Sequence, residues 1–374
     1  MKKNSKYILT IVAVIIALGV LFVPIMNTTS QFSMQKDDTI TIGSIGILTG
    51  EGSSWGNASK NGITMAAEEI NANGGINGKK LVIDYQDDKG DAKEALSAFE
   101  YLTSRGIDII VGTSWSNTGL PLIQVADSRK VLMISPSLGK PEFNESSKYL
   151  FNLWPHDVTS SRQLADYVYS KGHRTVSIIA CEQLWVNDQT KAFKERFEEL
   201  GGTIEVLVEP IPEQTTVLAE ATKLKNAKNS TALVSTTDGI LIGAKMAKAV
   251  RELGVTLPIY SVIIDSQVVN AGQGAYEGTE FLTYLTPTKS FKEKYEARFG
   301  QIEIGADTAY DAVMLIAQAI EKTKSTDTDK LQEYLNNLKT YSGASGELTF
   351  DGKGGTIKDS AVMKVKDSKI VQLE

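Results

Sequence analysis

The stretch from Val111 to Pro136 constrains the fold of this chain more than any other. The apolar run at residues 107–111 predicts a buried strand. Residues 120–130 predict a helix with Pro121 in its first turn, where the missing N–H of proline costs nothing. Residues 131–134 predict a second buried strand. A strand, a polar loop, a helix and a second parallel strand form one βαβ unit, so this stretch predicts an α/β fold.

The same alternation of strand and helix continues on both sides of this stretch and predicts doubly wound parallel sheets. A length of 374 residues suggests about two domains, each able to bury a core of its own. The predicted strands are 39–48, 80–85, 148–154, 175–181, 203–208, 232–235, 258–264, 280–285, 362–365 and 370–373. The predicted helices are 58–71, 91–104, 160–171, 189–200, 217–227, 240–253, 290–299, 306–322 and 329–339.

Composition excludes several kinds of site. The formal net charge of −6 offers no basic surface, so we expect no nucleic-acid partner. Two histidines and a single cysteine, Cys181, exclude an internal disulfide and argue against a zinc site. Gly50 and Gly52 begin a dinucleotide-binding fingerprint, but Trp55 stands where its third glycine belongs. We therefore expect neither a metal nor a cofactor.

The N-terminal segment predicts export. Residues 1–6 contain three lysines, and residues 7–26 are almost wholly apolar, as in a secretory signal or a signal anchor. No small-x-small cleavage site follows, and the segment has no cysteine to lipidate. We therefore favour an uncleaved anchor with a tether at 27–38 over signal cleavage. Either alternative places the folded part at the outer face of the cytoplasmic membrane.

The polar loop inside the opening stretch is a candidate binding site. It contains Ser114, Trp115, Ser116 and Asn117, just before the predicted helix. Hydroxyls and free backbone N–H groups at such a place can receive a carboxylate or a phosphate. The alternative is that Ser116 and Asn117 only cap the helix. Both roles are compatible, because a capping loop can also bind an anion.

Two tryptophans and two aspartates follow other predicted strands. Trp55 lies in a loop rich in glycine and serine, where we favour contact with a ligand over packing in the core. Trp185 has the same two alternatives with nearly equal weight. Asp238 and Asp265 follow strand ends, which is the crevice position of α/β sheets. Their alternative role is helix capping, which we favour for Asp238.

Several motifs of this chain are shared with one family. They are a G-x3-S-x4-P loop, an L-M-I-S-P strand, an A-x-x-x-I-N-x-x-G-G-I-x-G turn, a Y-D-A helix start and a G-x-x-x-F-D-x-x-G hairpin. With these motifs the chain resembles the leucine/isoleucine/valine-binding proteins, and more widely the type I periplasmic solute-binding proteins of ABC transporters. The resemblance extends from about Thr39 to the C-terminus.

The resemblance implies an α/β fold of two doubly wound parallel-sheet lobes joined by a three-strand hinge. It also implies that a monomer captures a small carboxylate-bearing ligand and delivers it to membrane-embedded ABC permease subunits. A ligand-sensing receptor ectodomain is the alternative. One G-x-S-x-G match, at residues 52–56, lacks the rest of a hydrolase site, so we expect no enzyme. The implied division of the chain is 1–38 for anchor and tether, 39–155 with 286–339 for lobe 1, and 156–285 with 340–374 for lobe 2.

The resemblance also implies roles for single residues. Ser116 and the backbone of Ser137, Leu138 and Gly139 would hold the ligand carboxylate. The tryptophans at 55 and 185 would form facing walls, and Asp265 would pair with an ammonium group. Amino-acid-binding relatives have a threonine hydroxyl near residue 139, where this chain has an apolar side chain instead. The expected ligand is a branched-chain or other hydrophobic amino acid, with a non-amino organic acid as the alternative.

Overall fold

The computed structural model describes residues 38–373. The predicted anchor and tether at 1–38 therefore lie outside the described residues, except for Asp38. None of the helices in the described part is long and apolar enough to cross a membrane.

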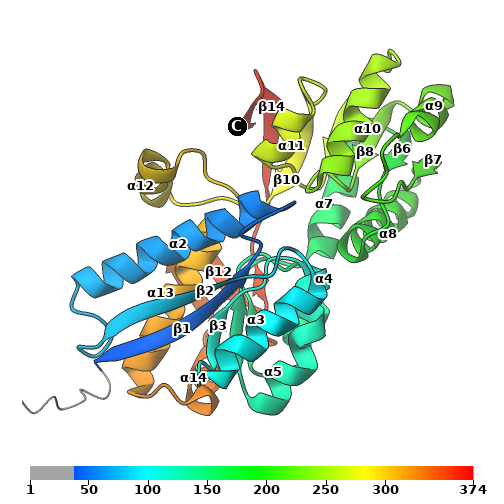
Figure 1. The fold of residues 1–374 in the computed structure, drawn as a ribbon. Helices are drawn as coiled ribbons and strands as arrows, with labels where there is room; N and C mark the ends of the chain where they lie inside the picture. Colours follow the sequence, from blue (N-terminus) through cyan, green and yellow to red (C-terminus); the bar gives the residue numbers. More distant parts are fainter. Residues whose placement is uncertain (1–37, 374) are drawn as a thin grey trace, which may run out of the picture. The chain divides into compact units, whose positions relative to one another are not determined.

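The first sheet has five parallel strands in the order β2-β1-β3-β4-β5 (Figure 1). Their bounds are β1 Thr39–Gly46, β2 Lys80–Asp87, β3 Ile109–Val111, β4 Leu132–Ser135 and β5 Leu150–Asn152. The connections contain α2 Ser53–Ala72, α3 Ala92–Ser104, α4 Ser116–Gly119, η1 Leu120–Leu122, α5 Ile123–Arg129 and α6 Pro141–Glu145. The stretch from Val111 to Pro136 thus contains the end of β3, a short helical loop, α5 and β4, as predicted. We call the part built on this sheet the first lobe.

Both faces of the first sheet are covered, which explains its continuous apolar strands. Ile109 and Val111 pack into one core cluster together with α2 and α13 (Ala306–Thr323), whereas Ile110 packs into another on the opposite face. The helices α2 and α13 lie side by side (Figure 1). A Cβ atom at Gly62 of α2 would lie 2.0 Å from the Ala306 carbonyl oxygen. Glycine there permits the close approach of the two helices.

The second sheet has seven strands in the order β15-β14-β10-β9-β8-β6-β7. The strands from β6 to β10 are parallel, and β14 and β15 are added antiparallel. Their bounds are β6 Thr175–Ile179, β7 Thr203–Val208, β8 Ala232–Ser235, β9 Ile259–Ser261, β10 Glu280–Thr283, β14 Ala361–Lys366 and β15 Lys369–Gln372. The covering helices are α7 Asp157–Ser170, α8 Leu184–Glu199, α9 Leu218–Asn226, α10 Leu241–Glu252 and α11 Ser266–Ala271. We call this part the second lobe.

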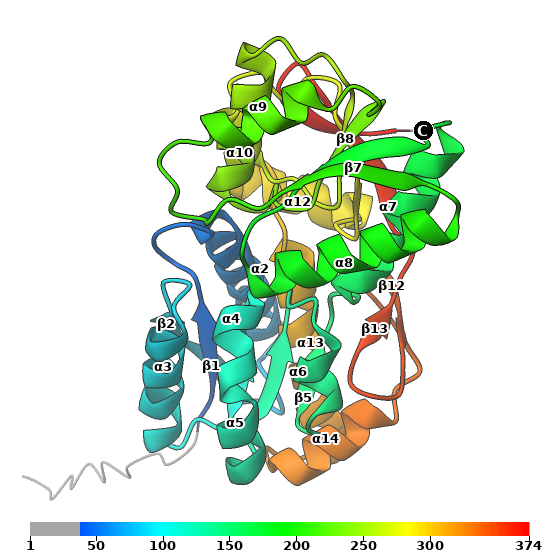
Figure 2. The same cartoon turned by 90° about the vertical axis from the view of Figure 1, so that its right-hand side faces the viewer.

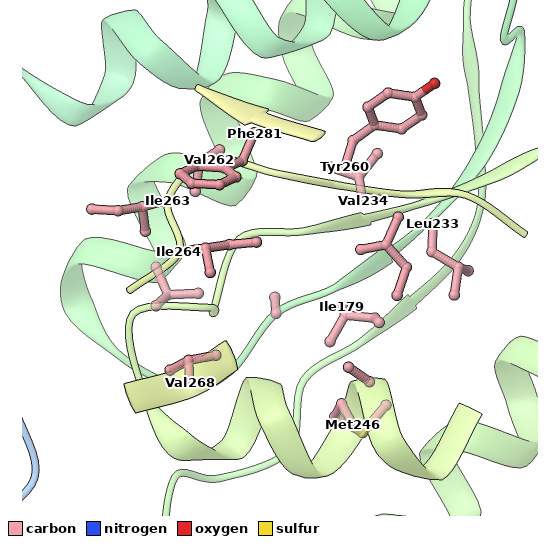
Figure 3. Close-up of a cluster of buried hydrophobic side chains, with 14 of the residues drawn as sticks. Ile179, Leu233, Val234, Met246, Tyr260, Val262, Ile263, Ile264, Val268 and Phe281 are labelled. Atoms are coloured by element: carbon pink, nitrogen blue, oxygen red, sulfur yellow. The ribbon is translucent and has the colours of Figure 1, made fainter. Parts of the chain in front are cut away.

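The core of the second lobe is a layer of aliphatic and aromatic side chains between the strands and helices. Figure 3 shows part of it, with Ile179 of β6, Val234 of β8 and Met246 of α10 in one cluster. Cys181 follows β6 and belongs to the same cluster. The thiol is fully buried, as expected for a small apolar core residue.

The chain passes between the two lobes at three places, after β5, after β10 and before β14. Figure 2 shows the first sheet in the lower half of the view and the second in the upper half. Three crossings form the hinge that the resemblance implied.

The last quarter of the chain returns to the first lobe before it ends in the second. It contains α12 Lys289–Phe299, α13, α14 Thr328–Asn336 and a small sheet of β11 Thr340–Gly343, β12 Gly346–Phe350 and β13 Thr356–Ile357. Leu348 and Phe350 pack in the core cluster of the first sheet. Asp311, from the Y-D-A motif, accepts hydrogen bonds from the N–H groups of Ala344 and Ser345, at 2.7 and 2.8 Å. These contacts tie the small sheet to the first lobe, whereas we expected all of 340–374 in the second lobe. The lobe boundaries as a whole stay a prediction.

Candidate ligand-binding site

A cavity lies where the two lobes meet. It is enclosed by the first turns of α2, α4, α7 and α8 and by the segments after β4 and β9. Its volume is ≈ 20 Å³, about the space that one water molecule needs. All four tryptophans of the chain line it. The lining residues are Trp55, Ser114, Trp115, Ser116, Ser137, Gly139, Trp154, Asp157, Trp185, Gln189 and Ile263.

The structure brings together most of the residues that the sequence marked as candidates. Those that line the cavity are Trp55, Ser114, Trp115, Ser116, Ser137, Gly139 and Trp185. The other candidates, Asn117, Leu138, Asp238 and Asp265, do not line it. Sequence reasoning missed Trp154, Asp157, Gln189 and Ile263.

The helices that carry these residues begin earlier than predicted. Trp55 was expected in a loop, but Gly52 adopts a left-handed conformation with φ of 82° and α2 begins directly after it. Trp185 likewise lies in the first turn of α8 rather than in a loop. Asp157 begins α7, three residues before the predicted start at Ser160. Helix starts next to the cavity contain polar and aromatic residues, which lack the apolar periodicity used to place them.

Leu138 does not line the cavity, so the expectation that its apolar side chain takes the place of the threonine hydroxyl is wrong. Its side chain is fully buried and packs with Phe143 in the core of the first lobe. Its carbonyl oxygen accepts a hydrogen bond from the side-chain amide of Asn152. Asn117 is also turned away, because its amide donates to the carbonyl oxygen of Gly90 at 2.7 Å.

Asp238 belongs to a buried network of the second lobe. The hydroxyl of Tyr276 donates to its carboxylate at 2.6 Å. Burial raises the pKa of Asp238 to about 6, and the hydrogen bond from Tyr276 opposes this shift. The adjacent helix α10 has no side-chain cap. Asp238 is therefore neither a lining residue nor the helix cap that we favoured.

Asp265 joins the two lobes. One carboxylate oxygen caps α11 by accepting from the Val268 N–H at 2.8 Å. The other accepts from the indole N–H of Trp55 at 2.7 Å and from the hydroxyl of Ser54 at 3.4 Å. Burial raises the pKa of Asp265, and these hydrogen bonds counteract the shift. Asp265 does not line the cavity itself, but its hydrogen bond fixes the position of Trp55, which does.

The tryptophan rings pack closely around glycines. The rings of Trp55 and Trp115 meet edge to face with centroids 6.2 Å apart. A Cβ atom at Gly52 would lie 2.3 Å from the ring of Trp115. At Gly239 a Cβ atom would lie 3.0 Å from Trp185 and 3.2 Å from Trp55. Rings from both lobes thus converge over a glycine of the second lobe, and larger residues there would push them apart.

Among the residues that the structure describes, Asp157 is the one acidic side chain that lines the cavity. It lies against Gly139, where a Cβ atom would come within 1.9 Å of the carboxyl carbon. Its backbone N–H donates to the Gly139 carbonyl oxygen at 2.9 Å. Burial raises the pKa of Asp157 to about 7, and hydrogen bonds from Gln189 and Trp154 oppose the shift.

Several polar atoms around the cavity lack a partner. Among the described residues, the indole nitrogens of Trp115 and Trp185 and the side-chain oxygen of Gln189 are buried without a hydrogen bond. A buried polar atom of this kind costs free energy until something pairs with it. The cavity thus presents two unused donors and one unused acceptor to a ligand.

Polar contacts between the lobes surround the cavity. The Glu51 carboxylate of the first lobe accepts from the Leu241 N–H at the start of α10, at 2.7 Å. Lys140 of the first lobe forms an ion pair with Asp188 of the second at 2.8 Å. With the bond between Trp55 and Asp265, these contacts hold the two lobes together over the site.

Comparisons with known proteins agree with this architecture. The family model of the periplasmic binding proteins matches residues 39–369. Leu/Ile/Val-binding protein homolog 3 of Brucella melitensis is 28% identical over 347 residues, which cover 90% of this chain and 94% of that protein. The crystal structure of a leucine-binding protein from Thermotoga maritima has a TM-score of 0.83 and 25% identity, and covers 90% of this chain and 98% of that chain. A branched-chain amino acid transporter substrate-binding protein from Streptococcus pneumoniae, solved with isoleucine, shares the fold, with a TM-score of 0.82, 24% identity, and coverage of 90% of this chain and 100% of that chain.

The family match covers both lobes and all three crossings between them. It confirms the resemblance and the fold class inferred from the motifs. The family consists of solute-binding proteins, which act outside the cytoplasm and are not enzymes. The chain belongs to the periplasmic binding protein family and has its type I fold.

Proposed function

We propose that this protein is the solute-binding component of an ABC importer and that it captures a hydrophobic amino acid between its two lobes. The observation that carries the proposal is the cavity itself. It lies between the lobes, and its lining contains four tryptophans and three serines of the first lobe, Ser114, Ser116 and Ser137. Apolar walls with a few convergent polar groups are the usual form of a small-molecule site.

In this proposal the serine side of the cavity receives the ligand carboxylate. Ser116 is 2% exposed and begins the short helix α4. The hydroxyl of Ser137 donates to the backbone oxygen of Ser114 at 3.2 Å, which fixes the two serines relative to each other. A hydroxyl that donates to a carboxylate forms a charge-assisted hydrogen bond, which is stronger than a neutral one.

Binding in this proposal requires the lobes to open. A cavity of ≈ 20 Å³ is too small for an amino acid. The hydrogen bond between Trp55 and Asp265 lies across the lobe interface, so opening must break it. Hinge motion at the three crossings admits the ligand, and closure then excludes water and strengthens the polar contacts.

The surroundings of the protein belong to the same proposal. The protein works as a monomer, presents the solute to ABC permease subunits, and is held at the membrane by an uncleaved segment at 1–38. Intact-mass analysis of membrane-extracted protein tests the anchor. A mature protein that starts between residues 27 and 38 would contradict it.

Isothermal titration calorimetry with the standard amino acids tests the ligand class. We expect saturable binding of leucine or another hydrophobic amino acid. Ser116→Ala should weaken it by about 1–2 kcal/mol, the cost of one charge-assisted bond, with an unchanged melting temperature. Ser128→Ala, on the exposed side of α5, is the matched control. Binding of organic acids alone, or full affinity in Ser116→Ala, would argue against the proposal.

A further inference from the structure

Three segments of the chain cross between the lobes. In chain order, the first crossing is 153–156, the second is 284–288 and the third is 358–360. The ring of Trp154 in the first crossing meets the ring of Tyr284 in the second edge to face, with centroids 5.6 Å apart. Trp154 also lines the ligand cavity. The second crossing therefore contacts a wall of the cavity through this pair of rings.

Lys358 connects the third crossing to the second. Its ammonium group donates to the carbonyl oxygen of Tyr284 at 3.0 Å. It donates a second hydrogen bond to the carbonyl oxygen of Ser345, in the turn between β11 and β12. Tyr284 directly follows β10 of the second lobe, whereas the N–H of Ser345 donates to Asp311 of the first. A single side chain thus bonds to backbone from both lobes at the hinge.

The surroundings of Lys358 favour an ammonium group that stays in place. The side chain is half-buried, and burial lowers the pKa of this lysine. Asp307 and Asp311 of α13 oppose that shift, because their negative charges favour the charged form. Both aspartates are fully buried. Removal of the ammonium group would leave them without this cation in a poorly solvated place, which is costly.

The first and third crossings are joined through the segments that precede them. The N–H of Asn152, at the end of β5, donates to the carbonyl oxygen of Gly354 at 2.8 Å. The hydroxyl of Thr356, at the start of β13, donates to the carbonyl oxygen of Asn152 at 3.4 Å. Each pair of crossings thus has a contact of its own. A change at Lys358 can therefore reach segments that lie far from it in the sequence.

We propose that Lys358 is a positioning residue for ligand capture, because its ammonium group fixes the second and third crossings to each other and, through Tyr284, fixes Trp154 at the cavity. Lys358 does not line the cavity itself. Without its two hydrogen bonds the crossings bend independently, and the closed arrangement of the lobes is less well defined. This inference rests on the proposed function, since it concerns the hinge that closes on the solute. Closed lobes retain the solute, so the loss should appear mainly in the rate of release.

Hydrogen–deuterium exchange of the ligand-free, full-length protein tests the connection between the crossings. Lys358→Met keeps a chain of similar length and removes the charge and both hydrogen bonds. We expect the amide hydrogens of all three crossings to exchange about tenfold faster or more, as for the loss of a hydrogen bond from a charged donor. Lys366→Met, at an exposed lysine on β14, is the matched control and should exchange as the wild type does. Faster exchange confined to the third crossing would refute the connection.

Stopped-flow kinetics with leucine test the consequence for capture. Lys358→Met should release leucine about tenfold faster than the wild type, with little change in the rate of association. Lys358→Arg keeps a cation that can donate to two carbonyl oxygens, so its release rate should lie within about threefold of the wild-type rate. A purely structural role predicts a lower melting temperature with wild-type leucine kinetics, and that result would overturn the proposal.

The two experiments separate this inference from the proposed function. If no amino acid binds the wild type, the proposed function fails, and exchange in the ligand-free protein still decides whether Lys358 couples the crossings. If leucine binds but Lys358→Met changes neither exchange nor release, the inference fails and the proposed function stands. If Lys358→Met does not fold, Tyr284→Leu replaces it, because it interrupts the ring contact with Trp154. Faster exchange at 153–156 in that variant supports the proposal, and wild-type exchange there refutes it.

Discussion

Replacement of Asp157 by asparagine should stabilise the ligand-free protein. Burial raises the pKa of this carboxyl from 3.8 to about 7. The difference is about three pKa units, and each unit corresponds to about 1.4 kcal/mol, so a fully desolvated carboxylate would destabilise the fold by about 4 kcal/mol. The side chain is partly exposed, and solvent reduces this cost to about 1–3 kcal/mol.

The pKa of Asp157 in the folded state and its ordinary value of 3.8 determine how the stability difference changes with pH. At pH 8 the carboxyl is ionised in both the folded and the unfolded state, so the folded state carries the whole desolvation cost. At pH 5 the folded state holds a proton that the unfolded state has mostly lost, which favours the folded state. The wild type should therefore gain stability relative to Asp157→Asn as the pH falls from 8 to 5. All other titrating groups are shared by the two proteins and cancel in the comparison.

Differential scanning calorimetry of ligand-free protein at both pH values measures this effect. At about 2 °C per kcal/mol for a chain of this size, the variant should melt about 2–6 °C above the wild type at pH 8. This difference in melting temperature should be smaller at pH 5. The control Asp108→Asn changes an exposed carboxylate just before β3, so it should melt at the temperature of the wild type at both pH values. A variant that melts below the wild type at pH 8, or a gap that is the same at both pH values, would refute the desolvation argument.

Three further predictions address other contacts. Trp55→Phe removes the indole N–H that donates to Asp265 across the lobe interface, so the ligand-free lobes should open. Small-angle X-ray scattering would detect the opening as a larger radius of gyration. An unchanged radius would show that this hydrogen bond does not hold the lobes closed. Gly139→Ala places a Cβ atom where the carboxylate of Asp157 lies, so it should lower leucine affinity at least tenfold in calorimetry, and unaltered affinity would contradict the tight fit. Asp311→Asn weakens three hydrogen bonds to the turn between β11 and β12 and should lower the urea unfolding free energy by about 1–3 kcal/mol, whereas a change under 0.5 kcal/mol would show that the turn is held by packing alone.

The fold was largely predictable because buried parallel strands leave a strong signal in the sequence. The side chains of β3, Ile109 to Val111, alternate between two core clusters, so all three positions are apolar. We expected residues 340–374 in the second lobe, but Leu348 and Phe350 pack in the core of the first lobe. Short hairpin strands have the same local pattern whichever lobe they pack against, so the sequence alone does not place them.

The site was predictable only in part, for a different reason. Serines and tryptophans at strand ends stand out in a sequence, and Ser116, Trp55 and Trp185 do line the cavity. Asp157 has no such signal, because one aspartate at a helix start has the same appearance as a common cap. Its place at the cavity depends on Gly139, which lies against it from another segment of the chain. Leu138 was misjudged because sequence order does not tell which side of a loop faces the core.

The gathering of all four tryptophans at one cavity has a practical consequence. When light excites indole selectively, the emission of the whole protein comes from this one place, because no tryptophan elsewhere adds a constant background. Indole emission responds to local polarity and is quenched by nearby charged groups, so opening, closure and ligand exchange should each alter its colour or intensity. The unmodified protein is therefore its own optical reporter, and stopped-flow fluorescence could time the motion of its lobes without any attached dye.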